Sequence, residues 1–292
     1  MFIDIHGHTY KYPYPDVNGR FLFSNPAQLT EIYNDLGIEK AVLLPLVGPE
    51  VYLPQSNDEI LEIYEEYKGI FIPFCNFDPR ALTNSPDAPF GYILSYYKEK
   101  GCRGVGEFIP NLPWFHPLIQ NFLKHVEKVK FLLIFEMAGS IGGDYRVYDE
   151  PGFFQFEDCL KNFPDLIFIG YGTVFWSEIS VLKIPSDRIT YPSYPVEKEG
   201  RVSQLCRKYP NLYGDLSAKS GFNAISRDPE YGVKFLNEFQ DKLFFGTDIC
   251  YPNTPVPLVD LLMKWKREKK ISEKVFNKIA KENLIKLLNL EE

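Results

Sequence analysis

Short apolar runs alternate with amphipathic stretches from the first residues of the chain almost to the last. The runs with the length of strands span residues 2–5, 41–44, 70–75, 104–108, 131–135, 166–170, 212–215 and 243–246. Most of them are continuously apolar, whereas a strand with one face in water would alternate apolar and polar residues. The pattern therefore predicts eight strands that are buried on both faces, as in a parallel sheet.

Between these runs, apolar residues recur at helical spacing. Ile60, Ile63 and Tyr67, for example, fall on one helical face, and Gly69 follows as a stop signal. Helices are predicted over residues 27–36, 58–67, 90–100, 116–129, 154–162, 202–208, 231–239 and 258–268, with two further helical segments within 272–290. The segment 185–200 is rich in Pro and Tyr, so a long loop is predicted there.

A strand followed by a helix, repeated eight times, predicts right-handed crossovers and one parallel sheet. The expected architecture is an α/β fold of the (β/α)8 TIM-barrel type, and an open doubly wound sheet is the alternative. The 292 residues suit such a barrel, because barrels of this type begin near ~200 residues. No Gly/Ser-rich linker divides the chain, so we expect a single domain over residues 1–292.

Composition excludes several functional classes. With 45% hydrophobic and 24% charged residues the chain is an ordinary globular protein, and its net charge of −7 argues against a nucleic-acid surface. No apolar run reaches the roughly 18 residues of a membrane span, and the N-terminus lacks the basic start of a signal peptide. The five cysteines are scattered without paired spacing, which favours a reduced, cytoplasmic protein. The expected partner is a small-molecule substrate. Whether the protein also forms a homo-oligomer stays open.

Two of the four histidines, His6 and His8, stand two residues apart at the end of the first predicted strand. Side chains at i and i+2 point to the same face of a strand, and the carboxyl end of a barrel strand is where barrel enzymes build their sites. The pair can therefore bind one metal ion. Packing of both imidazoles in the core is the alternative, but half of all histidines at one spot favours a metal.

Two carboxylates are placed to join this pair. Asp248 ends the eighth strand, which neighbours the first strand in a closed barrel. Capping of a following helix is the alternative for Asp248, although residues 249–252 start no obvious helix. Glu107 follows two glycines at the end of the fourth strand, where it is either a metal ligand or base, or a rim carboxylate.

Taken together, Asp-x-His-x-His, Gly-x-Gly-Glu and Phe-Gly-Thr-Asp at these three strand ends resemble the amidohydrolase-related family (amidohydrolase family 2) of metal-dependent TIM barrels. The stretches 168–172, 211–217 and 282–288 add to the resemblance, which spans nearly the whole chain. It implies a metal-dependent hydrolase in which metal-bound water attacks a C–N or C–O bond, as in an amide or a lactone. Decarboxylation is a close variant, because the family contains both activities.

The chain departs from the family pattern at two strands. Glu136 stands where the family has a metal-ligand histidine on strand five, and Tyr171 stands where it has a histidine after strand six. Glu136 is expected to replace the lost ligand with a carboxylate oxygen. Zn²⁺ is the expected cofactor, and the more oxygen-rich donor set would also suit Mn²⁺ or Fe²⁺. Tyr171 is expected to donate a proton to a developing oxyanion. Asp248 is expected to accept the proton of the metal-bound water, as the resemblance also implies.

The other two histidines do not fill these gaps. His125 has helical spacing to its apolar neighbours and is expected to pack on a helix, whereas His116 lies on the active side and can still approach the site. In the surrounding loops, Arg80 and Arg146 are candidates to bind an anionic substrate, and Trp176 is a candidate for contact with an apolar part. Solvated loop residues are the alternative for both arginines.

Two other functions stay open. A barrel that kept the fold and lost the chemistry would bind a small molecule or a protein partner, and the missing histidines motivate that hypothesis. A phosphoesterase of the polymerase-and-histidinol-phosphatase type also begins with His-x-His. Such sites need many more histidines than the four in this chain.

Overall fold

The structure is a computed structural model that describes residues 1–16, 18–51 and 53–290. Its main strands are β1 (Phe2–Gly7), β4 (Ile38–Leu43), β5 (Phe71–Pro73), β6 (Gly104–Phe108), β7 (Leu132–Ala138), β9 (Phe168–Tyr171), β10 (Leu212–Asp215) and β11 (Leu243–Phe244). They pair in parallel in the orders β1-β4-β5 and β11-β10-β9-β7-β6. All eight predicted strands are present.

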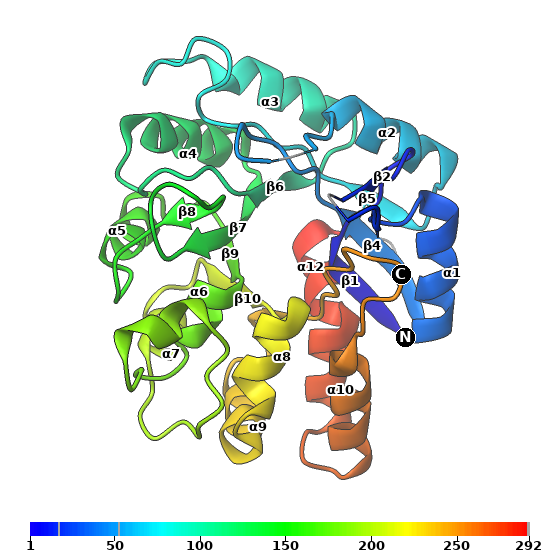
Figure 1. Cartoon of the computed structure of the whole chain (residues 1–292), viewed down its shortest axis with the longest axis vertical. Coiled ribbons are helices and arrows are strands. Elements are labelled where there is room, and N and C mark those ends of the chain that lie inside the picture. Colours follow the sequence, from blue (N-terminus) through cyan, green and yellow to red (C-terminus); the bar gives the residue numbers. More distant parts are fainter. Residues whose placement is uncertain (17, 52, 291–292) are drawn as a thin grey trace.

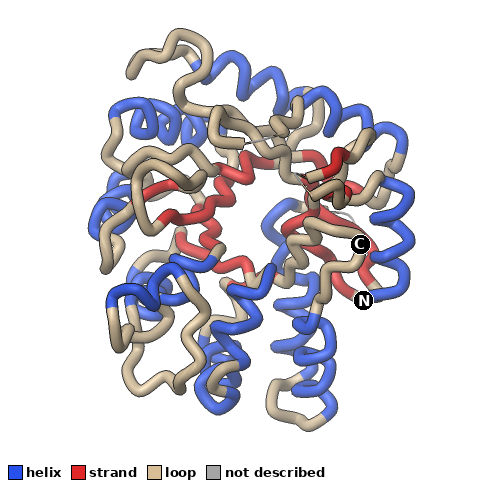
Figure 2. Tube along the Cα trace, in the orientation of Figure 1, coloured by secondary structure: helices blue, strands red, loops and turns tan. Residues whose placement is uncertain are grey.

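Further contacts join these two groups of strands into a closed cylinder. A parallel bridge between Cys75 and Val105 connects β5 to β6. On the other side, the Ile5 N–H donates to the Phe245 carbonyl at 3.1 Å, which connects β1 to the end of β11. Figures 1 and 2 show the resulting ring of strands with helices around it. The prediction of a (β/α)8 barrel is confirmed.

Most helices occupy the predicted ranges. They are α1 (Pro26–Leu36), α2 (Asn57–Glu66), α3 (Phe90–Glu99), α4 (Pro117–Val129), α5 (Phe154–Asn162), α7 (Arg201–Lys208), α9 (Pro229–Glu238) and α10 (Pro257–Arg267). The C-terminal segment forms α11 (Glu273–Asn277), the π-helical turn η2 (Lys278–Glu282) and α12 (Asn283–Leu288). Local signals set the ends: Asn25 and Gln28 form a capping box at the start of α1, and Gly37 ends that helix at φ +70°.

Several short elements were not predicted. They are the hairpin β2 (Tyr14–Pro15) and β3 (Phe21–Leu22), β8 (Val147–Tyr148), α6 (Thr173–Ser177), η1 (Pro185–Ile189) and α8 (Ala218–Ser226). In α6 the side chains from Val174 to Ser177 are all buried, so the helix has no polar face that would give it an amphipathic pattern. The 3₁₀ turn η1 lies in the segment predicted to be a loop.

The inside of the barrel is filled by side chains. Ile3, Ile5, Val42, Ile134 and Ile169 form one buried apolar cluster, together with residues of α12 that cover the cluster at one end. A second, larger apolar cluster lies between the strands and the surrounding helices. Because the interior is packed, polar chemistry has room only where the strands end, as in other barrels of this type.

Candidate metal centre

His6 and His8 lie at the end of β1 with their Nε2 atoms 3.1 Å apart, and both side chains are buried. The orientation of each ring is fixed by a hydrogen bond at Nδ1. His8 Nδ1 lies 2.9 Å from the Leu44 carbonyl, and His6 Nδ1 lies 2.7 Å from Asp215 Oδ2. Because a carbonyl and a carboxylate only accept, Nδ1 carries the proton in both neutral rings. Both Nε2 lone pairs are therefore free to bind a cation.

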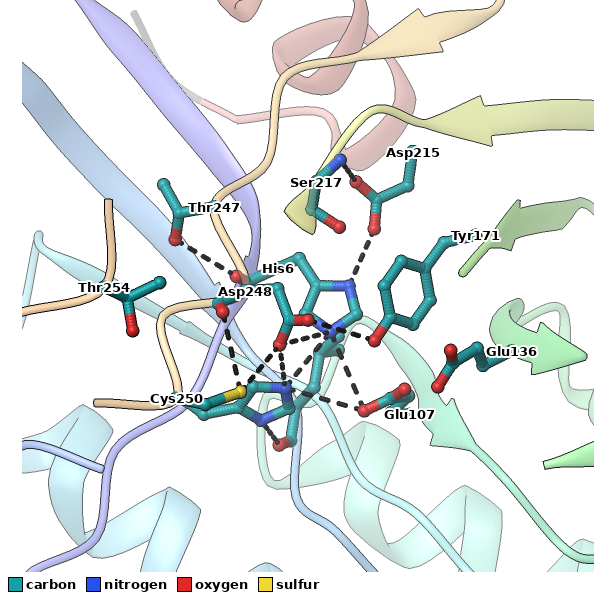
Figure 3. Close-up of polar contacts among 12 residues, drawn as sticks. His6, Glu107, Glu136, Tyr171, Asp215, Ser217, Thr247, Asp248, Cys250 and Thr254 are labelled. Carbon is teal, nitrogen blue, oxygen red and sulfur yellow. Dashed lines mark hydrogen bonds and ion pairs between the residues drawn. The ribbon is translucent and has the colours of Figure 1, made fainter. Parts of the chain in front are cut away.

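Two carboxylates, those of Asp248 and Glu107, lie beside this pair of histidines (Figure 3). Asp248 Oδ1 lies 3.5 Å from His8 Nε2 and 3.8 Å from His6 Nε2. Glu107 Oε2 lies 3.5 Å and 3.7 Å from the same two nitrogens. The structure thus brings together four of the five residues predicted to be metal ligands.

These separations suit a divalent cation. Donors 2.0–2.2 Å from a tetrahedral Zn²⁺ lie roughly 3.3–3.6 Å from one another. The distance between the two imidazoles and the distances from each imidazole to each carboxylate run from 3.1 to 3.8 Å. Glu107 is buried, and its other oxygen, Oε1, has no hydrogen-bond partner within the described residues. A buried carboxylate oxygen without a partner is costly unless a cation or water satisfies it. The donor set therefore fits a metal ion.

The electrostatics of the protein alone also fit a positive charge at this point. Burial lowers the pKa of His6, but the Asp215 carboxylate outweighs burial and holds that pKa well above its usual range. Burial raises the pKa of Asp248, yet the close contact with His8 and the charge of His6 bring it below the ordinary value. The surroundings thus favour ionised Asp248 and a positive charge between the carboxylates.

The backbone around Asp248 is fixed by its neighbours. Asp248 has φ +53°, a left-handed conformation that Asp tolerates better than most residues. Its N–H donates to the His6 carbonyl at 2.9 Å. Asp4 accepts the N–H groups of His6 and Thr247 at 2.8 and 2.9 Å, which ties the ends of the first and last strands together. Burial raises the pKa of Asp4 to about 6 despite these bonds.

Asp215 is a functional residue that the sequence analysis missed. Its Oδ2 holds His6, its Oδ1 accepts the Ser217 N–H at 2.8 Å, and the residue is fully buried at the end of β10. The signal that singled out Asp248, a carboxylate that ends a buried strand, applies equally to Asp215. Asp215 is a positioning residue, because it would act on a metal ion only through His6, whose ring it orients.

Tyr171, at the end of β9, lies beside His6 with 4.3 Å between the ring centroids. Its hydroxyl donates to Asp248 Oδ2 at 3.1 Å, so Asp248 Oδ1 is left to face the histidines. Burial and the nearby Asp248 carboxylate raise the pKa of Tyr171 well above its usual value, which keeps the hydroxyl a donor. The role predicted for Tyr171 at a substrate oxyanion stays a prediction.

Glu136 lies in the same mouth but outside the donor set. Arg146 Nε binds its Oε2 at 2.6 Å, and among the described contacts Glu136 pairs with neither histidine. Burial raises the pKa of Glu136 to about 8, Arg146 lowers it, and the charge of Glu107 raises it further. The prediction that Glu136 replaces the missing histidine ligand is therefore not supported by its position, because Arg146 holds the carboxylate aside.

The three residues predicted to contact substrate differ in their exposure and in their partners. Arg146 is half-buried at the mouth, where Asp144 and the Tyr145 hydroxyl also contact it. Arg80 is paired with two carboxylates, those of Glu50 and Asp78. Trp176 is in the wrong place for the predicted contact with substrate: it is 2% exposed in the apolar core.

The physical reason is that α6 turns the Trp176 ring inward against the sheet. Its indole N–H donates to the main-chain carbonyl of Asp215 at 2.7 Å, so the residue supports the strand end instead. The spare histidines also lie outside the donor set. His116 does not approach it, because it caps α4 through the Leu118 N–H. His125 lies on α4 and packs beside Gly91 of α3, which fits the expected packing role.

Residues 197–290 match the family model described as amidohydrolase. No curated protein matches the sequence. Among solved structures, the chain resembles a probable 2-pyrone-4,6-dicarboxylic acid hydrolase from Acinetobacter baumannii that holds citric acid. The identity is 14%, 99% of each chain is covered, and the TM-score is 0.60.

Two decarboxylases are also similar in fold. The 2,6-dihydroxybenzoate decarboxylase from Rhizobium is 16% identical, with 100% of this chain and 99% of that chain covered and a TM-score of 0.59. The 5-carboxyvanillate decarboxylase from Sphingomonas paucimobilis is 15% identical, with 94% and 84% covered and a TM-score of 0.53. The chain is thus similar in sequence to the amidohydrolase family over residues 197–290, and it shares the barrel fold of these structures over almost its whole length.

Proposed function

We propose that the protein is a metal-dependent hydrolase of the amidohydrolase-related type that cleaves a C–N or C–O bond, as in an amide or a lactone, of a small anionic substrate. The observation that supports this most is the convergence of His6, His8 and Asp248 on one point, with Glu107 Oε2 within 3.7 Å of both imidazoles. A bound divalent cation supplies positive charge that polarises a substrate carbonyl and makes water more acidic. Two nitrogen and two oxygen donors suit Zn²⁺, and also Mn²⁺ or Fe²⁺.

Asp248 is the proposed proton acceptor. It is ionised, because its pKa lies below the ordinary value, and its Oδ1 faces the point on which the donors converge. Tyr171 holds the other oxygen, Oδ2, and so fixes the direction in which Oδ1 points. A carboxylate oriented in this way can take a proton from water on one side and pass it to a leaving group.

Arg146 is the proposed anchor for the substrate. It lies at the mouth, and about a quarter of its side chain is exposed (26%), so a ligand can reach the guanidinium. The three similar structures are named for substrates that carry carboxylates, which supports an anionic substrate here. An arginine fork matches a carboxylate in a bidentate way. Arg146→Gln is expected to raise KM for carboxylate substrates roughly tenfold or more and to spare neutral analogues.

Decarboxylation is the second candidate activity, because two of the similar structures are decarboxylases. The same residues would serve, with the cation and Arg146 holding the carboxylated substrate and a protonated side chain delivering a proton to carbon. Product analysis separates the two reactions: hydrolysis adds water and keeps all carbon, whereas decarboxylation releases carbon dioxide. A panel of aryl carboxylates and cyclic esters, assayed for both products, decides between them.

The metal requirement itself is tested by analysis of protein purified without chelator. The expected result is about one transition-metal ion per chain, and none in the His6→Ala/His8→Ala double variant. His125→Ala is the matched control, because His125 lies on α4 outside the donor set. Less than about a tenth of an equivalent in the wild type after reconstitution, or unchanged metal in the double variant, would overturn the proposed function. A wild-type protein that binds no metal would favour the alternative hypothesis, a barrel that has kept its fold and lost its catalytic activity.

A reducing location is also proposed. All five cysteines are free, and four of them are buried, which is typical of chains that fold in a reducing compartment such as the cytoplasm. Among the described residues, no helix combines the length and the apolar character needed to cross a bilayer.

A further inference from the structure

Arg146, the proposed anchor for the substrate, has an unusual backbone conformation. Its φ is +109°, in the range that favours glycine, and a residue with a side chain stays there only where its surroundings fix it. The loop that carries Arg146 leaves β7 after Ala138 and returns beside that strand as β8, where Val147 pairs with Met137 (Figure 1). The contacts that fix this loop therefore also fix the position of the guanidinium.

Asn111, in the segment between β6 and α4, binds the loop at three places. Its side-chain amide donates to the carbonyls of Ser140 and Arg146, both at 3.1 Å, and its Oδ1 accepts the Gly142 N–H at 2.6 Å. Asn111 is 6% exposed, so these bonds form away from bulk water, where a hydrogen bond is stronger. One buried side chain thus joins the start of the loop to Arg146 at its end.

The backbone of Arg146 is held on both sides of its Cα. Its N–H donates to the carbonyl of Ile109, which directly follows β6, at 2.8 Å, and its own carbonyl accepts the Asn111 amide. These two bonds fix the peptide groups that flank the positive φ. The side chain of Arg146 therefore leaves the backbone in one direction, toward Glu136.

The guanidinium keeps two N–H groups for a ligand. Nε lies 2.6 Å from Glu136 Oε2, Nη1 donates to Asp144 Oδ1 at 2.6 Å, and Nη2 donates to the Tyr145 hydroxyl at 2.9 Å. Each terminal nitrogen carries two N–H groups, so one on each is left without a partner among the described residues. One N–H from each terminal nitrogen is what a guanidinium uses to bind a carboxylate in a bidentate way. The position of Arg146 thus decides where a substrate carboxylate binds.

We propose that Asn111 is a positioning residue for the proposed reaction: by holding Arg146 in its strained conformation, it sets the place at which the substrate carboxylate binds. The inference rests on the proposed function, in which Arg146 is the anchor. Asn111 acts only through Arg146, because the three bonds to the loop use both its amide nitrogen and its oxygen.

Asn111→Asp is the sharpest test, because it changes the donor and keeps the size of the side chain. An aspartate oxygen still accepts the Gly142 N–H, whereas the carbonyls of Ser140 and Arg146 then face an oxygen that cannot donate. The loop is therefore expected to release Arg146 without a cavity being left in the fold.

Asn211→Asp is the matched control. Asn211 is also 6% exposed and lies just before β10, at the end of the strands opposite to the mouth. Its amide donates to the carbonyls of Leu160, Phe163 and Leu166. Both variants lose buried amide–carbonyl bonds, so both are expected to be less stable, but only Asn111→Asp acts on Arg146.

Hydrogen exchange at Arg146 Nε is the first readout, and it needs neither metal nor substrate. The signal is observed by NMR of isotope-labelled protein and assigned by its absence in Arg146→Gln. Asn111→Asp is expected to speed this exchange roughly tenfold or more, and Asn211→Asp to leave it at the wild-type rate. Arg188 Nε, which donates to Glu178 at 2.6 Å, is the reference in every variant. Unchanged exchange at Arg146 in Asn111→Asp would overturn Asn111 as a positioning residue.

Binding of 2,6-dihydroxybenzoate to the zinc-loaded protein is the second readout. Arg146→Gln and Asn111→Asp are each expected to weaken this binding roughly tenfold or more, with Kd for Zn²⁺ unchanged, and Asn211→Asp is expected to bind as the wild type does. An equal loss in Asn211→Asp would reveal a general structural effect and overturn the proposal. Unchanged binding in Arg146→Gln would instead overturn the anchor in the proposed function, and this inference with it.

Discussion

Replacement of Asp215 by asparagine tests how the protein holds its first metal ligand. Asp215 Oδ2 fixes the His6 ring through Nδ1 at 2.7 Å, and Oδ1 accepts the Ser217 N–H at 2.8 Å. The carboxylate thus accepts two hydrogen bonds, whereas an asparagine amide has only one oxygen. If that oxygen still accepts the Ser217 N–H, the amide NH₂ faces His6 Nδ1. The ring then carries its proton on Nε2, where it cannot bind a cation.

The expected loss in metal affinity follows from this competition. Replacing the partner of a metal-binding histidine costs typically ~10–100-fold in affinity, which is about 1.4–2.7 kcal/mol. The upper part of this range is expected, because Asp215 is fully buried and no water replaces the lost hydrogen bond. Removal of His6 itself would cost more, since the ligand atom would be lost.

The assay is a competition titration with a chromogenic chelator, which gives Kd for Zn²⁺ in the folded protein. Asp149→Asn is the matched control: Asp149 is also a buried carboxylate that accepts a backbone N–H, that of Phe156 at 2.8 Å, but it contacts no histidine. Its Kd is expected to equal the wild-type value. A Kd of Asp215→Asn within about twofold of wild type would refute the argument that Asp215 orients His6.

Three further substitutions probe the residues around the site. Gly172→Ala would place Cβ 2.2 Å from Glu136 Cγ at φ +93°, so the free energy of unfolding in urea is expected to fall by about 2–4 kcal/mol. Gly142→Ala, at φ +80° with no atom within 4 Å, is expected to cost only about 1 kcal/mol, and equal losses would contradict the steric explanation. Tyr171→Phe removes the donor to Asp248 Oδ2 and is expected to weaken metal binding roughly tenfold; unchanged affinity in the chelator assay would contradict that role.

The barrel was predictable because its strands are buried on both faces. Runs such as residues 131–135 are apolar without alternation, and the helices between the strands have clear stop signals such as Gly37. The short elements could not be predicted in the same way. α6 has five residues, too few for a periodic pattern, and the hairpin strands β2 and β3 have two each.

The donor set was predictable from strand ends alone. In a barrel, residues that follow the strands share one face, so His6, His8, Glu107 and Asp248 meet although they lie far apart in sequence. The same rule placed Glu136 there as a ligand, but it says nothing about competing partners. The ion pair with Arg146, ten residues later, decides where that carboxylate lies.

The substrate contacts were less predictable, because an aromatic residue after a strand can face the mouth or the core. Trp176 follows β9 as closely as a mouth residue would, yet α6 turns its ring into the core. The spacing from a strand predicts where a residue lies along the barrel axis. It does not predict whether a short helix directs the side chain toward the mouth or toward the core. Asp215, by contrast, is predictable, because it is a carboxylate at the end of a buried strand, as Asp248 is.

Anomalous diffraction from crystals of the protein grown with Zn²⁺ tests the metal centre most directly. The expected result is one strong peak at the zinc edge, bounded by His6 Nε2, His8 Nε2, Asp248 Oδ1 and Glu107 Oε2. A density map with no anomalous peak among these four side chains, or with the peak elsewhere on the protein, would contradict the proposed metal centre.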